Sequence, residues 1–162
     1  MNAKPNVSEF GSVDPAPPSN EPSVDHNMRC LIDENEKMFL RMRAVFALRN
    51  IGGKEAVMAL ARGFNSNSAL LRHEIAYVLG QMQDSNALEV LSRVLSDESE
   101  HVMVRHEAAE ALGAIGDHRA LPILNRYLEH KDPEISESCE VAIDLLEFVS
   151  NSTKESINDS SY

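Results

Sequence analysis

A repeated triplet constrains the fold of this chain more than any other feature. The runs LLRHEIAYVLGQ at 70–81 and MVRHEAAEALGAIG at 103–116 each carry Arg-His-Glu near the start of an apolar helical pattern, and the two histidines are 33 residues apart. Self-similarity at such a period is typical of stacked helical repeats. The triplets therefore predict a repeat fold that presents chemically active side chains at matching positions.

The same apolar register occurs twice more, around residues 41 and 136, so the repeat unit is 31 to 33 residues long. Gly and Asp at the joins favour a helix stop followed by a new N-cap, which makes each unit a helical hairpin. Hairpins of this size cannot bury their apolar faces singly, so about four of them should stack into an all-α solenoid. The triplet helices should line its concave surface, and we expect the intervening helices at 54–64, 87–95 and 119–128.

Four side chains of the two triplets are candidates for a shared site. Consecutive residues of a helix project about 100° apart, so a His and the Glu beside it can both reach a face that neighbouring helices share. Packed helices lie roughly 8–10 Å apart, and two imidazoles can close this gap around one cation with bonds of about 2.0–2.2 Å. We therefore predict a metal or proton-transfer site formed by His73, Glu74, His106 and Glu107.

The alternative is that each His-Glu pair is an ordinary solvated surface pair. Two occurrences in one register disfavour it, because the outer repeats carry Met42-Arg43 and Glu137-Ser138 at the same places. Packing of the repeat therefore does not require His-Glu. Two histidines with one or two carboxylates suit Fe(II), Mn(II) or Zn(II), and the spacing does not choose among these metals.

Composition excludes several other classes of function. The 26 acidic residues outnumber the 15 basic ones, and a net charge of -11 disfavours nucleic acid as a partner. No apolar run of about 18 residues is present to span a membrane. The first residues lack the apolar stretch of a secretion signal, and the two cysteines, Cys30 and Cys139, fit reduced thiols. These features together predict a cytoplasmic protein with no nucleic-acid and no membrane partner.

The chain divides into three parts by composition. Residues 1–22 are rich in proline and small polar residues, which predicts a disordered, linker-like segment. Residues 23–149 carry the helical periodicity and should form the repeat domain. The polar residues 150–162 are expected to be a disordered tail.

The residues also carry a resemblance to a known family. The runs LLRHEIAYVLGQMQD at 70–84 and MVRHEAAEALGAIGD at 103–117 resemble the paired His-Glu segments of deoxyhypusine hydroxylase. The resemblance extends to RMRAVFALRNIGGKEA at 41–56, to SESCEVAIDLLE at 136–147 and to SVDPAPP at 12–18.

This resemblance implies a HEAT-type α-solenoid and an Fe(II)-dependent monooxygenase with a di-iron centre. The family hydroxylates the deoxyhypusine side chain of eukaryotic translation initiation factor five A, which completes hypusine. Carried over residue by residue, His73, His106 and Glu107 resemble iron ligands. Glu74 is either a further ligand or an acid placed near the substrate amine.

The resemblance covers the carboxy-terminal half of the family pattern. A full member is similar to two such halves with four His-Glu pairs, whereas this chain carries two pairs. The second half of the site would then come from another half or from a second copy of the chain. The alternative function, from a different class, is a non-catalytic HEAT-repeat scaffold whose concave surface binds a protein.

Overall fold

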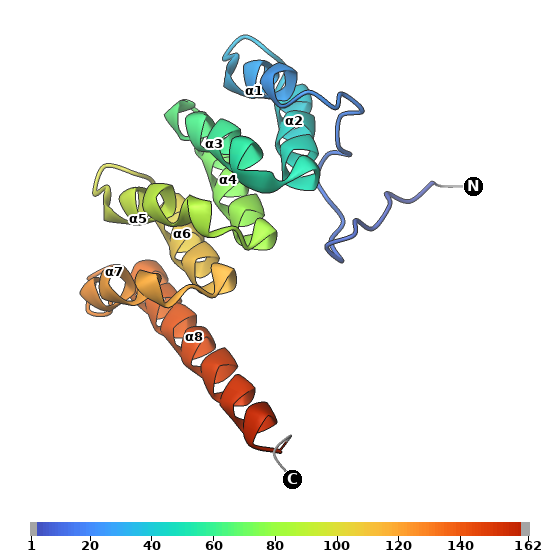
Figure 1. Ribbon diagram of the computed structural model, residues 1–162. Coiled ribbons are helices and arrows are strands. Elements are labelled where there is room, and N and C mark those ends of the chain that lie inside the picture. Colours follow the sequence, from blue (N-terminus) through green and yellow to red (C-terminus); the bar gives the residue numbers. More distant parts are fainter. Residues whose placement is uncertain (1–2, 160–162) are drawn as a thin grey trace.

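The computed structural model describes residues 3–159 of the chain, and this part is a stack of helical hairpins without strands (Figure 1). The odd-numbered helices form one layer and the even-numbered helices form the other. The predicted all-α solenoid of four hairpins is confirmed. Its helices are α1 (Val24–Ile32), α2 (Met38–Ile51), α3 (Gly53–Arg62), α4 (Ala69–Met82), α5 (Leu88–Ser96), α6 (Val102–Ile115), α7 (Leu121–Arg126) and α8 (Pro133–Asp159).

The hairpins are delimited by the residues that the sequence indicates. Helix α6 ends at Gly116, which has the left-handed φ of 78° that glycine adopts at little cost. The side chain of Asp117 then accepts a hydrogen bond from the Arg119 amide and starts a 3-10 turn. Because such turns precede α5 and α7, these helices begin one or two residues later than their sequence pattern predicts.

An arginine at the first position of the triplet register closes the first and the third hairpin. Nε of Arg41 donates to the Leu31 carbonyl at 2.8 Å, and Nε of Arg105 donates to the Leu95 carbonyl at 2.9 Å. Each carbonyl lies in the last turn of the preceding helix, where it has no partner within that helix. Both arginines are buried, so they stabilise the repeat and do not face the site.

Small residues set the distance between the inner helices. A Cβ added at Gly80 in α4 would lie 3.0 Å from the Cα of Ala111 in α6. A Cβ added at Gly113 in α6 would lie only 2.8 Å from the Cα of Ala142 in α8. These close approaches bring the side chains on α4, α6 and α8 within reach of one another.

The N-terminal segment differs from the disordered linker that its composition predicts. Residues 3–22 form no helix or strand, yet residues 14–18 contact α2, while the first described residues extend away from it (Figure 1). Ala16 is buried, and Arg43 donates to the carbonyls of Pro17 and Pro18. The carbonyls of an extended proline-rich segment have no partner within the segment, so a neighbouring arginine satisfies them. Residues 1–2 lie outside the described part.

The C-terminal end also differs from its prediction. A tail is expected from residue 150, but α8 continues through Asp159, because no Gly or Pro interrupts residues 134–159. Residues 160–162 lie outside the described part. In residues 3–159 no helix combines the length and the apolar character that crossing a bilayer requires. The outer face of α8 exposes an apolar stripe formed by Val141, Leu145, Phe148 and Val149.

Candidate metal centre

Both His-Glu pairs lie one turn into their helices, His73 and Glu74 in α4 and His106 and Glu107 in α6. The close packing of α4 on α6 brings three of the four side chains together. Oε2 of Glu107 lies 3.2 Å from Nε2 of His73 and 3.8 Å from Nε2 of His106. Ligand atoms that bind one metal ion at about 2.1 Å are about 3.0–3.5 Å apart. Glu107 therefore lies within reach of both histidines, and the two imidazoles would have to move closer together to share one ion with it.

Glu107 is the central group of this cluster and the most buried. Its side chain is 10% exposed, and burial raises its pKa to about 7. Burial is the largest cause of this shift; the nearby carboxylates of Glu110 and Glu74 add to it, and His106 opposes it. A bound cation would strongly stabilise a carboxyl group with such a raised pKa, because it favours the charged form.

Glu74 stands beside the cluster and not within it. Its closest approach to a histidine is 4.0 Å, from its own neighbour His73. Burial raises the pKa of Glu74, His73 lowers it, and the carboxylate of Asp14 raises it. The structure thus separates the two glutamates: Glu107 faces both histidines, and Glu74 lies on the side of α4 that faces the N-terminal segment.

Two further residues belong to the site, and the sequence analysis did not single them out. Oγ of Ser138 in α8 lies 2.6 Å from Nδ1 of His106. Oε1 of Glu110, one turn after His106, lies 3.7 Å from the same nitrogen. The spacing of Glu110 four residues after His106 was a usable signal, since such side chains meet on a helix. Among the described residues, the group whose ligand atoms all lie within 4.8 Å of one another is His106, Glu107 and Glu110, and it does not include His73.

A groove of about 520 Å³ opens beside Glu107. Its walls are partly apolar and include Phe10, Tyr77 and Val141, while Glu107 and Glu110 contribute carboxylates. Such a groove fits a ligand that combines a hydrocarbon chain with a cationic group.

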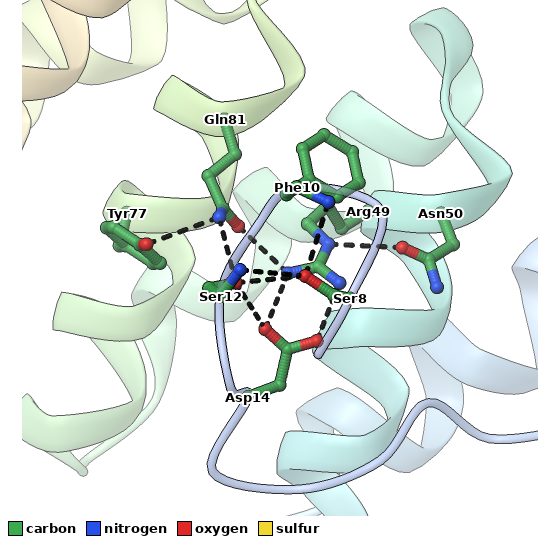
Figure 2. A network of polar contacts seen from close by, with 8 residues as sticks. All are labelled: Ser8, Phe10, Ser12, Asp14, Arg49, Asn50, Tyr77 and Gln81. Atoms are coloured by element: carbon green, nitrogen blue, oxygen red, sulfur yellow. Dashed lines mark hydrogen bonds and ion pairs between the residues drawn. The ribbon is translucent and has the colours of Figure 1, made fainter. Parts of the chain in front are cut away.

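The N-terminal residues 8–14, which we call the strap, reach one edge of this groove through Phe10. Figure 2 shows the strap held by Arg49, whose guanidinium makes two hydrogen bonds to Asp14 at 2.7 and 2.9 Å. The ring of Phe10 lies 4.4 Å from the same guanidinium. Gln81 accepts from Arg49 and donates to Ser12, which ties the strap to α4 as well.

The Arg49–Asp14 pair is almost free of solvent, with side chains 0% and 7% exposed. Burial acts to raise the pKa of Asp14, but the hydrogen bonds from Arg49 and Ser12 outweigh it and hold this pKa below its usual value. Arg49 occupies in α2 the register position that Gly80 and Gly113 occupy in α4 and α6. The strap is therefore attached through a residue that the first repeat alone carries.

Family models place the chain in a class. The model of HEAT repeats matches residues 64–144, and the model of the PBS lyase HEAT-like repeat matches residues 40–66. The chain belongs to the HEAT-repeat proteins.

Within this class, the chain is similar to deoxyhypusine hydroxylases of several organisms. The chain is 56% identical to deoxyhypusine hydroxylase of Arabidopsis thaliana, over 87% of this chain and 45% of that protein. It is 50% identical to deoxyhypusine hydroxylase of Gallus gallus, over 90% of this chain and 48% of that one. The structure of human deoxyhypusine hydroxylase in complex with glycerol matches with a TM-score of 0.86 at 47% identity, covering 90% of this chain and 50% of that one. The chain is thus a homologue of the deoxyhypusine hydroxylases and spans about half of their length.

Proposed function

We propose that this chain provides one metal-binding half of a deoxyhypusine monooxygenase, which hydroxylates the deoxyhypusine side chain of translation initiation factor five A. The observation that carries the proposal is the cluster of His73, His106 and Glu107, with separations of 3.2 and 3.8 Å. It occurs on a chain about half-identical to deoxyhypusine hydroxylases along half of their length.

The donor set fits Fe(II). Two imidazoles and one carboxylate that leave further coordination positions free are typical of non-haem iron enzymes that use oxygen. In this proposal His73, His106 and Glu107 hold one iron, and the second iron of a di-iron centre is held by a second half. Fe(II), when bound, supplies the activation of dioxygen that hydroxylation of a carbon requires.

The remaining residues of the site bind and orient the substrate. Deoxyhypusine is a long aliphatic side chain with amines, so its methylene groups suit the apolar groove walls at Phe10, Tyr77 and Val141. Its charged amines are attracted to carboxylates at short range. Glu74 lies beside the cluster at 4.0 Å from His73 and is our candidate for holding an amine next to the iron, where fixed orientation lowers the barrier.

The partner of the site is the deoxyhypusine-bearing translation factor. The opposite wall comes from a second half, either in the same protein or in another copy of this chain. Because the substrate is a translation factor, we place the reaction in the cytoplasm.

The test is iron binding and hydroxylation by the chain combined with a second half. We expect the wild type to bind Fe(II) and a His73→Ala, His106→Ala double variant to lose it. Glu74→Gln should keep the iron and weaken binding of the deoxyhypusine-bearing factor about tenfold or more, because it removes a charged partner of the amine. Anaerobic calorimetry and iron content measure both effects.

Equal iron content in the wild type and the double variant would contradict the proposal and favour a non-catalytic HEAT scaffold. Loss of iron in Glu74→Gln with unchanged substrate affinity would make Glu74 a metal ligand. A variant that changes neither would return Glu74 to an ordinary surface group.

A further inference from the structure

We propose that Ser138 is a positioning residue for His106, whose hydroxyl keeps the imidazole proton on Nδ1 and leaves Nε2 free to bind a metal ion. The part that concerns the metal rests on the proposed function. The placement of the proton does not, because it follows from hydrogen bonds within this chain.

The hydroxyl of Ser138 has one proton and two neighbours at short range. Its Oγ lies 2.5 Å from the carbonyl oxygen of Glu134, one turn earlier in α8, and 2.6 Å from Nδ1 of His106. A carbonyl can only accept, so the serine proton must lie on the contact with Glu134. If it pointed to His106, two bare oxygens would face each other at 2.5 Å. Oγ of Ser138 therefore accepts, and Nδ1 of His106 must carry the proton that is donated to it.

Two carboxylates face the ring at similar distances and do not choose a tautomer by themselves, so the choice rests on Ser138. Oε1 of Glu110 lies 3.7 Å from Nδ1 of His106 and adds negative charge on that side of the ring. The opposite nitrogen, Nε2, faces Oε2 of Glu107 at 3.8 Å. In the neutral tautomer with the proton on Nδ1, Nε2 carries the free lone pair, on the side of the ring near Glu107, which also contacts His73.

This arrangement distinguishes two possible sets of metal ligands. A set of His106, Glu107 and Glu110 that used Nδ1 would have to break the contact with Ser138. The set of His73, His106 and Glu107 uses Nε2 and leaves that contact intact. The hydroxyl thus disfavours any set that uses Nδ1 and favours ligation through Nε2, as in the second set, in which Glu110 is a neighbour of the ring and not a ligand.

The repeat register explains how the hydroxyl comes to this place. His73 contacts Glu107, the residue at the glutamate position of the next repeat. His106 contacts Ser138, which occupies that same position one repeat further on. The last repeat carries no His-Glu pair, and at this position it supplies a buried hydroxyl to the last histidine. Hydrogen bonds to the second nitrogen of a metal-binding histidine commonly change metal affinity by about 10–100-fold.

The test begins with the metal-free chain labelled with ¹⁵N-histidine, at about pH 8.5, above the ordinary imidazole pKa. Long-range ¹H–¹⁵N correlation spectra report which ring nitrogen of His106 is protonated. We expect Nδ1–H in the wild type and a mixture, or Nε2–H, in Ser138→Ala. Ser136→Ala is the matched control, because Ser136 lies in the same turn of α8 and donates to the Pro133 carbonyl.

Fe(II) affinity, measured by anaerobic calorimetry, is the second readout. Ser138→Ala should weaken it about tenfold, Ser136→Ala should leave it unchanged, and Ser138→Thr, which keeps the hydroxyl, should restore most of it. Thermal unfolding of each variant separates these effects from a loss of folding.

Three results would overturn the inference. One is an Nε2–H tautomer in the wild type, and another is a Ser138→Ala variant with unchanged tautomer and unchanged affinity. The third is a Glu110→Gln variant that loses more affinity than Ser138→Ala, which would make Glu110 the ligand. If the wild type binds no Fe(II), the proposed function fails, and the tautomer spectra still decide the role of Ser138.

Discussion

The two His-Glu pairs share a triplet and a register but have different surroundings. Glu107 in α6 lies between two imidazoles and is 10% exposed, whereas Glu74 in α4 is 18% exposed and lies no closer than 4.0 Å to His73. His106 is held by the hydroxyl of Ser138, whereas His73 meets the carboxylate of Glu107.

The difference shows that a repeat fixes where a side chain stands, while the next repeat decides what that side chain contacts. Glu107 is followed by α8, which closes the site with Ser138. Glu74 is near enough to the strap for the carboxylate of Asp14 to raise its pKa, and the strap has no counterpart at the other repeats in the described residues. Three predictions address this contrast, beginning with the largest effect.

The strap, which lies on the side of the His73–Glu74 pair, should contribute strongly to the stability of the fold. Asp14→Asn leaves the buried guanidinium of Arg49 without its charged partner, so we expect a loss of about 3 kcal/mol in the free energy of unfolding. Chemical denaturation measures it. The control is Asp25→Asn, which removes an exposed ion pair with Arg29 and should cost at most about 0.5 kcal/mol. Equal effects of the two variants would show that the strap is not anchored by Asp14.

The two glutamates should differ in how they link stability to pH. The pKa of Glu107 is raised from 4.5 to about 7 in the folded chain, so the folded state binds more protons than the unfolded state between these values. The contribution of Glu107 to the free energy of unfolding is fully present below about pH 4.5. It is lost as the pH rises through about 7, a change on the order of 3 kcal/mol.

Other carboxyl groups, such as Asp14, have lowered pKa values and act in the opposite direction. The measurement is therefore the difference in unfolding free energy between the metal-free wild type and Glu107→Gln across this pH range. The same difference for Glu74→Gln should be smaller. A pH dependence that is unchanged in Glu107→Gln would refute the assignment.

Close helix packing should matter more for stability beside the His106–Glu107 pair, between α6 and α8, than beside the His73–Glu74 pair, between α4 and α6. Alanine at Gly113 would place its Cβ 2.8 Å from the Cα of Ala142, while alanine at Gly80 would approach Ala111 at 3.0 Å. We expect losses of about 2 kcal/mol for Gly113→Ala and about 1 kcal/mol for Gly80→Ala, since overpacking outweighs the better helix propensity of alanine.

These two variants also separate the two contacts. Gly113→Ala should disturb the proximity of His106 to Ser138, and Gly80→Ala that of His73 to Glu107. Nitrogen chemical shifts of the two imidazoles report which contact changes. The reverse order of stability losses would indicate that α8 yields more easily than α6.

The fold and part of the site could be predicted because they follow from local pattern. The hairpins repeat a helical period with Gly and Asp at the joins, and the ligand candidates recur at one register. The role of Ser138 could not be predicted, since an isolated serine in a helical pattern carries no sign of what faces it. The strap could not be predicted, because the proline-rich composition of its segment is typical of linkers. Its partner Arg49 carries no sequence signal that distinguishes it from a surface residue of α2.

Arg41 and Arg105, which share one register position, separate architecture from chemistry. Arg41 closes the first hairpin in the same way as Arg105 closes the third, although Met42 and Arg43 follow Arg41 where His106 and Glu107 follow Arg105. A repeat can therefore acquire or discard a pair of ligands through two point substitutions while its hairpin stays intact. In evolutionary terms, an array of this kind can exchange an enzymatic for a purely structural repeat, one unit at a time, without passing through an unfolded ancestor.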